Sequence, residues 1–403
     1  MSTSLLYHGW GIRGYYLVRE EFGQGRIVHV IEQEDWRLRC PACGSPRVIR
    51  RGYCWRLFRS LPIGGRPVFV RFAVPRVGCQ ACGAVRQVKL GFAEQRVSYT
   101  RAMERYILEL CRRMTIADVA SHLGMCWDTI KDIHKRNLGK RFRRPKLKRL
   151  RLIAIDEISI GHGQRYLTVV LDLKTGAVVF VASGRSAEAL APFWRRVRAS
   201  GAKVKAVAMD MSPAYIAAVW KALPKAKIVF DRFHVIKLFN EKLSDLRRQV
   251  QSSAEGLAKK VLKCTRWLLL KNPENLEKRR DEKQRLAEAL RLNEPLATAY
   301  YLREDLRQFW EQFDKASARE FLDDWIARAE ASGITMLKKF ARTLTVHRYG
   351  LLSWYDFPIS TGPLEGTNNK IKTLQRRAYG FRDREYFTLQ IYALHEKKYA
   401  LVG

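Results

Sequence analysis

The sequence lacks the features that would place this chain in or across a membrane. No uninterrupted apolar run in its 403 residues approaches the roughly 20 residues that a membrane-spanning helix requires. The segment Met1–Trp10 has no basic start followed by an apolar stretch, so we expect no secretory signal, a cytoplasmic protein and no membrane partner. Internal repeats and low-complexity tracts are also missing. Hydrophobic residues still make up 47% of the chain, which excludes wholesale disorder, and the length favours about two to four domains.

Acidic residues are scarce relative to basic ones. The chain carries 39 Asp and Glu against 75 Lys and Arg, which gives a formal net charge of +36. A surplus of this size favours a polyanionic partner, with nucleic acid ahead of an anionic membrane surface. The alternative is a merely basic surface of the kind found on ribosomal proteins.

Cysteine is sparse, and half of the eight cysteines form two C-x-x-C pairs that are each followed by glycine. These pairs are Cys40 with Cys43 and Cys79 with Cys82. Two thiolates in one tight turn can bind the same ion, so two such turns supply the four ligands of a tetrahedral structural Zn²⁺. Two disulfides are the alternative. The missing export signal and the four remaining cysteines argue against disulfides; those four are Cys54, Cys111, Cys126 and Cys264.

The stretch between the cysteine pairs has the pattern of a β-hairpin. Val68, Val70, Phe72 and Val74 occupy alternate positions, which suits a strand with one buried face, and Ile63–Arg66 contains a Gly-Gly turn. We therefore expect the cysteine turns to flank a hairpin, as in a zinc ribbon.

A helical segment from about residue 99 to residue 136 follows. Ala120, Gly124, Ile130 and Ile133 fall at the spacings of a helix-turn-helix: a small residue for close approach, a glycine for the turn and two apolar residues that seat the second helix. An ordinary helical hairpin is the alternative. If the motif binds DNA, the exposed face of its second helix carries the contacts Trp127, Lys131 and Lys135.

A strongly basic stretch from Lys135 to Arg151 comes next, and it suits phosphate contacts beside a DNA-binding motif. We expect Arg141, Arg143 and Arg144 to bind DNA from this linker. The alternative is a charge run that is only solvated.

From Leu152 the order of elements is β-β-β-α-β-α-β, which is the order of the ribonuclease H fold. We expect a strand Leu152–Ile155 to end in Asp156 and a strand Val204–Met209 to end in Asp210. Carboxylates at these strand ends lie where open α/β sheets place their sites, although an aspartate there is often only a helix cap. Asp231 follows a further strand, which we expect to be the outer one of the set, so Asp231 is expected to orient the following helix or to contact DNA rather than to replace Glu365 as a ligand. Glu157 is interpreted as structural or outward-facing, and His162 and His234 are interpreted as structural or substrate-contacting groups.

Residues from about 241 to 342 are charged and helical, with apolar residues at helical spacing such as Leu286 and Leu290 or Phe309 and Phe313, and we interpret them as an all-helical insertion. Trp310 and Trp325 within it are expected to pack in its core rather than to stack on a DNA base. After it, a helix is expected to begin near Gly362 and to project Glu365, Asn369 and Lys372 from one face. The basic residues Lys370 and Lys372, with Arg376 and Arg377, are expected to line a DNA path.

Taken together, these motifs resemble a bacterial insertion-sequence transposase of the ISL3 family. The resemblance rests on the cysteine motif, the helix-turn-helix, Ala154–Glu157, Met209–Ser212, Phe230–His234 and Gly362–Lys370 in this order. It implies a multidomain α/β protein with a ribonuclease H-like catalytic core and an all-helical insertion, preceded by a small zinc-binding β domain and a helix-turn-helix. The expected domains are 1–95 (zinc ribbon), 96–150 (helix-turn-helix and linker), 151–240 (first core part), 241–345 (insertion) and 346–403 (second core part).

The resemblance also implies a DDE active site with Asp156, Asp210 and Glu365 as its acids. Hard cations take carboxylate ligands, and two Mg²⁺ (or Mn²⁺) ions can activate the nucleophile and stabilise the leaving group in phosphodiester cleavage. The expected function is binding of terminal inverted repeats, DNA cleavage and strand transfer, by an oligomer that is at least a dimer on double-stranded DNA in the bacterial nucleoid. A metal-dependent nuclease without strand transfer and a non-catalytic DNA-binding regulator are the alternatives.

Overall fold

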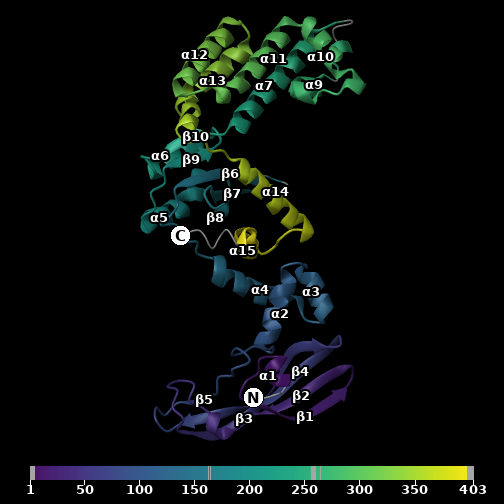
Figure 1. Ribbon diagram of the computed structural model, residues 1–403, viewed down its shortest axis with the longest axis vertical. Helices are drawn as coiled ribbons and strands as arrows, with labels where there is room; N and C mark the ends of the chain where they lie inside the picture. The colour runs from purple at the N-terminus through teal and green to yellow at the C-terminus, as the bar shows by residue number, and fades with distance from the viewer. Residues whose placement is uncertain (1–4, 162, 164, 256–259, 264, 397–403) are drawn as a thin grey trace. The chain divides into compact units, whose positions relative to one another are not determined.

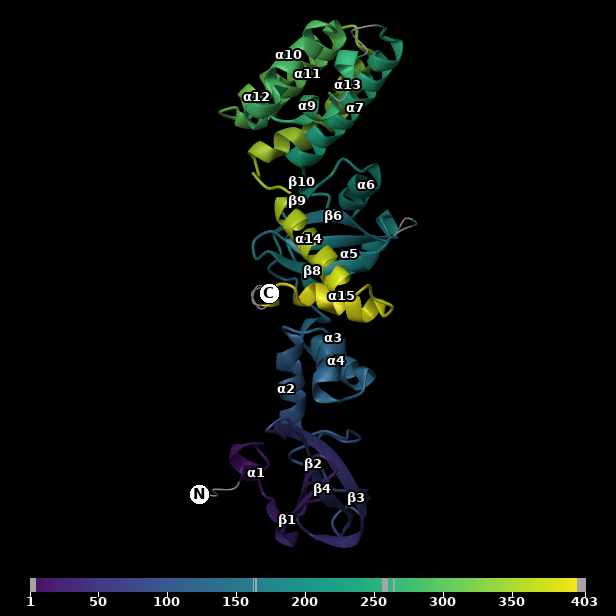
Figure 2. The ribbon, with the colours of Figure 1, turned by 90° about the vertical axis from the view of Figure 1, so that its right-hand side faces the viewer.

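The computed structural model describes residues 5–161, 163, 165–255, 260–263 and 265–396 (Figures 1 and 2). The chain divides into two compact units between Arg141 and Phe142, and each is described by itself. His162 and Cys264 lie outside the described residues. No helix in the described part of the chain has the length and apolar character needed to cross a membrane.

The N-terminal unit is built on a mixed sheet. A short helix α1 (Leu5–His8) precedes β1 (Tyr16–Gly23), β2 (Arg26–Glu32), β3 (Val48–Ile63), β4 (Arg66–Cys79) and β5 (Val85–Gln87), and the sheet order is β1-β2-β4-β3 with β5 on β4. The hairpin prediction is confirmed, because β3 and β4 pair antiparallel across Gly64 and Gly65. Both glycines have positive φ, as a two-residue hairpin turn requires.

The alternating residues of β4 form one face of the core, as expected. Val68, Val70, Phe72 and Val74 are at most 3% exposed, and they pack with Phe58 of β3 and Ile31 of β2. Because side chains alternate across a strand, the intervening residues of β4 lie on the other, open face of the sheet.

Three helices complete the N-terminal unit: α2 (Arg101–Cys111), α3 (Ile116–Leu123) and α4 (Trp127–Phe142). Thr115 and Asp118 form a capping box at the start of α3, and Gly124 ends it with a φ of +58°. Ile130 and Ile133 are completely buried, as the helix-turn-helix pattern predicted.

The basic linker is shorter than the sequence suggested. Because α4 continues to Phe142, the first part of the basic stretch, including Lys135 and Arg141, is helical. The buried residues Ile130, His134 and Leu138, spaced four apart, sustain the helix. After it, Leu147 and Leu150 are buried in the core of the C-terminal unit, so residues 143–150 follow that unit's surface rather than forming a free tether.

The C-terminal unit contains the ribonuclease H-like sheet. Its strands are β6 (Leu152–Gly161), β7 (Arg165–Asp172), β8 (Ala177–Ser183), β9 (Ala206–Met209) and β10 (Lys227–Phe230), in the order β10-β9-β6-β7-β8. The first three pair antiparallel, whereas β9 runs parallel to β6 and to β10. Helices α5 (Ala191–Ser200) and α6 (Pro213–Ala222) connect the later strands. This arrangement confirms the predicted fold class and places β10 at the edge.

The strand that carries Asp156 does not end there, which corrects the sequence interpretation. β6 continues to Gly161, and Asp156 pairs with Val169 of β7. Its ladder with β9, however, ends at Ala154 and Ala208. Asp156 therefore lies just beyond the point where β9 stops, because only the antiparallel hairpin with β7 sustains the second half of β6.

The insertion is helical in its described part. It contains α7 (Arg232–Ser253), α9 (Arg266–Leu270), α10 (Glu282–Arg291), α11 (Glu294–Arg307), η5 (Gln308–Glu311), α12 (Lys315–Ala331) and α13 (Thr335–Leu352). Trp310 and Trp325 are buried, as expected for core residues. Phe313, grouped with the apolar pattern of this region, is instead 97% exposed, because the chain leaves its helical path before Asp314 caps α12.

Helix α13 brings the chain back to the sheet. It packs on β10 at Gly350, where a Cβ would overlap the ring of Phe230, so glycine permits the close approach. Helix α14 (Gly362–Arg377) then lies along the sheet beside β6, and both views show it there (Figures 1 and 2). Gln375 near its end donates a hydrogen bond to the carbonyl of Ile160. Helix α15 (Arg384–Ala393) packs on β8, where the Tyr392 hydroxyl accepts a hydrogen bond from Val181 N–H.

Candidate catalytic and zinc sites

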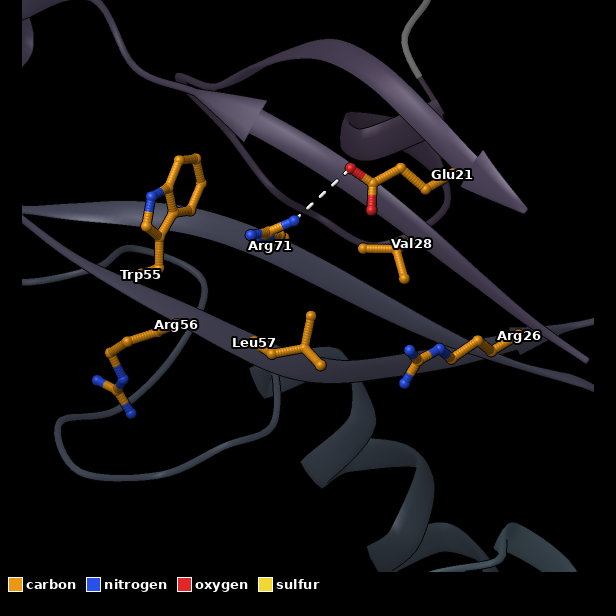
Figure 3. A pocket seen from close by; sticks show the side chains of 7 residues that line it. All are labelled: Glu21, Arg26, Val28, Trp55, Arg56, Leu57 and Arg71. Atoms are coloured by element: carbon orange, nitrogen blue, oxygen red, sulfur yellow. Dashed lines mark ion pairs between the residues drawn. The ribbon is translucent and has the colours of Figure 1, made fainter. Parts of the chain in front are cut away.

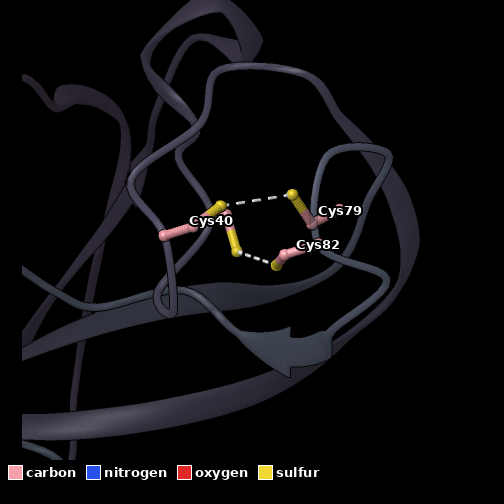
Figure 4. Close-up of side chains that lie close together, drawn as sticks. Cys40, Cys79 and Cys82 are labelled. Carbon is pink, nitrogen blue, oxygen red and sulfur yellow. Dashed lines mark hydrogen bonds between the residues drawn. The ribbon is translucent and has the colours of Figure 1, made fainter.

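The four cysteines of the two C-x-x-C turns converge on one point. Their sulfurs all lie within 4.8 Å of one another, and Figure 4 shows those of Cys40, Cys79 and Cys82 turned toward a common centre. The Sγ–Sγ distances are 3.7 Å for Cys40 and Cys82 and 3.6 Å for Cys43 and Cys79. These distances exclude disulfides, whose S–S length is about 2.05 Å.

The cluster fits Zn²⁺. A tetrahedron with Zn–S bonds of about 2.3 Å has edges of roughly 3.8 Å, which is close to the distances found here. The backbone N–H of Cys43 makes the largest contribution to a shift that lowers the pKa of Cys40 to about 6, against the opposing effect of burial. The turn backbone thus favours the thiolate of Cys40, which is the form that binds metal. At Cys82 the backbone N–H of Ala84 acts in the same direction, but the other three thiols outweigh it and raise the pKa to about 12. The four cysteines form a zinc-ribbon metal site.

Asp156 is the central carboxylate of the second site. Its side chain is 18% exposed, and its Oδ1 accepts a hydrogen bond from Glu157 N–H at 2.8 Å. His234 Nε2 lies 4.0 Å from the same oxygen. Burial raises the pKa of Asp156 above its ordinary value, and the charge of Asp210 raises it further, while the Glu157 N–H, His234 and Asn368 act in the opposite direction. Asp156 therefore carries a negative charge that its surroundings only partly compensate.

Asp210 and Glu365 occupy different positions relative to Asp156. Asp210 follows β9, the strand beside β6, and its Oδ1 accepts a hydrogen bond from Ser212 N–H at 3.0 Å. Glu365 is exposed in the first turn of α14. Among the described residues, only the four cysteines bring three or more candidate ligand atoms within 4.8 Å of one another. The structure thus brings Asp210 into electrostatic contact with Asp156, while the three acids do not form a closed ligand cluster.

Asn368 is the residue of this site that the sequence analysis missed. It lies on α14, and its Nδ2 donates a hydrogen bond to Asp156 Oδ2 at 2.8 Å. Its own Oδ1 is buried and has no hydrogen-bond partner. The sequence analysis chose Asn369, which is exposed together with Lys372. The sequence spacing could have identified Asn368 as a residue that faces the sheet. The buried residues of α14 have the i, i+3, i+4, i+7 spacing of one helix face: Leu364, Thr367, Asn368 and Ile371.

Glu157 has the structural environment that was expected for it. Burial raises its pKa, whereas a hydrogen bond from the Tyr215 hydroxyl lowers it. The Tyr215 hydroxyl lies 2.8 Å from the hydroxyl of Thr168, which in turn donates to the carbonyl of Gly184. Glu157 therefore belongs to a polar network that joins β6, β7 and α6.

Asp231 is a helix cap. Its Oδ1 accepts hydrogen bonds from Phe233 N–H and His234 N–H at the start of α7, as the interpretation of this residue as a helix-orienting group predicted. Its Oδ2 accepts from Thr361 N–H at 2.7 Å, and Thr361 is the residue that precedes α14. Asp231 is 3% exposed, so one buried carboxylate fixes the starts of two helices that meet near Asp156.

The residues expected to contact DNA lie mostly at the surface. In the helix-turn-helix, Trp127 is exposed, Lys131 and Lys135 are half-buried, and Lys131 Nζ lies 5.3 Å from the centroid of the Trp127 ring. Arg141 and Arg144 are exposed, and Arg143 pairs with Glu385 at 3.1 Å. Lys372 is exposed as well, and Lys370 Nζ lies 3.1 Å from His395 Nε2.

The open face of the N-terminal sheet has a shallow depression of about 240 Å³ (Figure 3). Seven side chains line it: Glu21, Arg26, Val28, Trp55, Arg56, Leu57 and Arg71. The guanidinium of Arg71 stacks over the Trp55 ring at 4.9 Å and pairs with Glu21 at 3.7 Å. This face adds Arg26 and Arg71 beside the exposed Trp55 indole to the basic surface of the N-terminal unit, whereas Arg56 is directed to the other face of β3, where it lies over the Phe58 ring.

Family comparisons agree with this arrangement along most of the chain. Residues 153–391 match a model described as "Transposase" for the DDE domain of the ISL3 type. Residues 88–136 match the helix-turn-helix domain of transposase family ISL3, and residues 36–82 match the zinc-finger of transposase IS204/IS1001/IS1096/IS1165.

Individual relatives are transposases as well. The transposase for insertion sequence element IS1001 of Bordetella parapertussis is 33% identical over 392 residues, which cover 96% of each chain. The transposase for IS1557 of Mycobacterium tuberculosis (strain ATCC 25618 / H37Rv) is 30% identical over 370 residues, which cover 85% of this chain and 82% of the relative. A solved Drosophila P element transposase strand transfer complex is 12% identical with a TM-score of 0.40, covering 75% of this chain and 93% of the other.

The ribonuclease H-like core, the zinc ribbon and the helix-turn-helix define a DNA-binding transposase of the DDE type, an enzyme of DNA cleavage and transesterification. Within that class, the chain belongs to the ISL3 family.

Proposed function

We propose that this chain binds the terminal inverted repeats of an insertion sequence, cleaves DNA at the element's ends and joins them to a target. Asp156, Asp210 and Glu365 are the proposed metal ligands. The observation that carries this proposal is the position of Asp156, which is mostly buried just beyond the end of β9, the strand that Asp210 follows. Two carboxylates held together at the cost of a raised pKa are typical of a site that takes a cation.

Glu365 completes the set from α14. The helix is fixed on β6 by the contact of Asn368 with Asp156, and Glu365 precedes Asn368 by three residues, which is about one helical turn. Because Mg²⁺ keeps several waters and is held by few protein ligands, an exposed third carboxylate suits it. Bound by these groups, two Mg²⁺ (or Mn²⁺) ions would supply an activated nucleophile and charge stabilisation at phosphorus.

The remaining residues of the site position these carboxylates. Asn368 holds Oδ2 of Asp156, the Glu157 N–H holds Oδ1, and Asp231 fixes the start of the helix that carries Glu365. Asp156, at the centre of the site, would hold the ions together with Asp210 and Glu365. Water attack at the element's end would release a 3′-OH, and that hydroxyl would attack the target strand in line, so that one phosphodiester bond forms as another breaks.

DNA recognition is assigned to the basic surfaces of both units. The helix-turn-helix residues Trp127, Lys131 and Lys135 are proposed to read the terminal repeats, and the phosphate contacts are Arg141, Arg143, Arg144, Lys370 and Lys372. The proposed domains are 1–95, 96–150, 151–240, 241–345 and 346–403, and the proposed place of action is the bacterial nucleoid. We also propose that the protein acts as an oligomer that is at least a dimer on DNA, because two ends must be cut and joined together.

The test is a reaction with DNA that carries the flanking repeats of the element itself, in the presence of Mg²⁺, with products mapped on both strands. We expect nicks at the repeat ends and joined products, both lost in Asp210→Asn and retained in Glu320→Gln, an exposed carboxylate on α12. Cleavage without joined products would show a nuclease instead. Binding to the repeats without cleavage in the presence of any divalent metal would instead indicate a non-catalytic DNA-binding regulator.

A further inference from the structure

The turn between α14 and α15 presents one aromatic ring entirely to solvent. Tyr379 is fully exposed, and its backbone has a φ of +51°. The turn is ordered by hydrogen bonds from Tyr379 N–H to the carbonyl of Arg376 and from Gly380 N–H to the carbonyl of Gln375. These bonds end α14 in the way in which helices commonly end, with a left-handed residue just past the last turn.

Tyrosine is an unusual residue at this position. Glycine, and less often asparagine, takes the left-handed conformation at helix ends because a β-carbon disfavours it. Nothing in the described structure packs against the ring to compensate, since the side chain is as accessible as in an extended peptide. A residue whose backbone is strained and whose side chain is wholly exposed is typical of a residue that contacts a binding partner.

The charges around this ring favour a polyanion. Arg376, Arg377, Arg382 and Arg384 lie within five residues of Tyr379 and are all exposed. The segment also contains two acids, since Asp383 caps α15 through Tyr386 N–H and Glu385 pairs with Arg143, so four arginines against two acids leave it with a net positive charge. Phe313 provides a contrast: it is equally exposed, but Glu311 and Asp314 are its charged neighbours on the N-terminal and C-terminal sides.

The position of the turn links it to the site of chemistry. Tyr379 follows Asn368 by 11 residues along α14, which corresponds to roughly 16 Å at 1.5 Å per residue. That distance spans about five base steps of DNA at 3.4 Å each. A DNA end with its scissile phosphate at Asp156 can therefore extend along α14 to the exposed ring.

We propose that Tyr379 stacks on an unpaired or extruded base of the DNA end, while the four arginines bind the backbone on both sides. This inference rests on the proposed function and names one contact of the same site. An aromatic side chain supplies a face on which any base can stack, and arginines supply the phosphate contacts that hold the strand there. The two tryptophans considered for this role, Trp310 and Trp325, are buried and cannot supply it.

The test compares two DNA probes with the full-length protein in buffer without Mg²⁺ and without chelator, so that the zinc stays bound and no cleavage occurs. One probe is a fully paired duplex, and the other has the same sequence with one unpaired adenine, moved step by step from the end. The wild type should prefer the unpaired probe by about ten-fold at one position, as expected for one base–aromatic stack. Tyr379→Ala should abolish this preference, Tyr379→Phe should keep it, and Phe313→Ala should leave it unchanged.

Tyr379→Gly separates stacking from folding, because glycine suits the φ of +51° better than tyrosine does. Its melting temperature should equal or exceed that of the wild type while the preference is lost. A preference that survives in Tyr379→Gly, or one that disappears in Tyr379→Phe, would overturn the proposal. Because the probes need no particular sequence and no Mg²⁺, these results are independent of whether the protein cleaves its own repeats.

Discussion

The zinc ribbon and the proposed catalytic site of this chain differ in how closely their ligands are assembled. In the zinc ribbon, four sulfurs lie within 4.8 Å of one another, and the backbone lowers the pKa of Cys40 to about 6. In the catalytic unit, burial and Asp210 raise the pKa of Asp156, and Glu365 is exposed on its helix. In the zinc ribbon the turn backbone favours the charged form of Cys40, although the other three thiols raise the pKa of Cys82 to about 12, whereas burial in the catalytic unit disfavours the charged form of Asp156.

This difference follows from what each site does with its ion. A structural ion is bound once and contributes folding energy, so turns that preform the ligand cage are useful. A catalytic site must also take DNA phosphate and water as ligands. The proposed ligands lie on β6, after β9 and on α14, and the repulsion between Asp156 and Asp210 would be relieved when cations and substrate bind.

The strongest test of the comparison concerns the third acid. Glu365→Gln keeps the size of the side chain and removes its charge, so Mg²⁺-dependent cleavage should fall by several orders of magnitude while binding to the terminal repeats survives. Asp231→Asn should reduce the rate of cleavage less, because Asp231 caps α7 and holds Thr361 at the start of α14. The measurement is the rate of strand cleavage, with binding followed separately.

Folding must be checked in the Asp231→Asn protein. Asparagine cannot accept all three hydrogen bonds through one oxygen, so we expect a loss of about 1–3 kcal/mol of stability. If Glu365→Gln still cleaved while a folded Asp231→Asn did not, Asp231 would replace Glu365 as the third ligand.

The sequence predicted most of what depends on local spacing. The cysteine turns, the hairpin at Gly64 and Gly65, the helix-turn-helix at Gly124 and the strand order of the core follow from short patterns whose geometry is set by neighbouring residues. The same reasoning placed the strand before Asp231 at the edge of the sheet, because β-β-β-α-β-α-β allows few arrangements.

Features that depend on tertiary contacts could not be predicted from the sequence in the same way. Whether β6 ends at Asp156 depends on its pairing with β7, and the choice between Asn368 and Asn369 depends on which face of α14 meets the sheet. Phe313 looked like a core residue because the register of the apolar pattern does not reveal where the chain turns before Asp314. A single sequence does not specify these contacts.

The zinc site gives the second test. Purified protein should contain about one tightly bound zinc per chain, measured by elemental analysis. Cys43→Ser should lose that zinc and unfold the ribbon, because metal binding there is folding energy, while the ribonuclease H-like unit stays folded. Cys54→Ser is the matched control, since Cys54 is exposed on β3 outside the cluster. Wild-type protein without zinc, or a Cys43→Ser protein that keeps it, would contradict the preformed cage.

Asn368 provides the third test, on the catalytic side. Removing a group that holds a metal ligand commonly costs about 10–100-fold in metal affinity or activity. Asn368→Ala should therefore lower cleavage by that amount and shift the dependence on Mg²⁺ to higher concentrations. Asn369→Ala, on the exposed face of the same helix, should leave the Mg²⁺ dependence in place. Equal shifts in both variants would show that Asn368 acts only through the stability of α14.

The smallest expected effect concerns the strain between Asp156 and Asp210. A carboxylate whose pKa is raised in the folded protein stabilises it below the pKa of the unfolded chain, and this stability is lost as pH rises through the folded value. In metal-free protein at neutral pH, Asp156→Asn should therefore raise the melting temperature of the C-terminal unit, by about 2–4 °C for each kcal/mol recovered. Asn368 can accommodate the change by turning its amide, so that its unpartnered Oδ1 accepts a hydrogen bond from the new side chain.

Addition of Mg²⁺ should stabilise the wild type and not the variant, and the advantage of the variant should vanish below about pH 4, where an unfolded aspartate is also protonated. Scanning calorimetry across pH, with and without Mg²⁺, measures both effects. A variant that is less stable than the wild type at neutral pH would mean that Asp156 is stabilised by its partners even without a cation, and the contrast with the zinc site would fail.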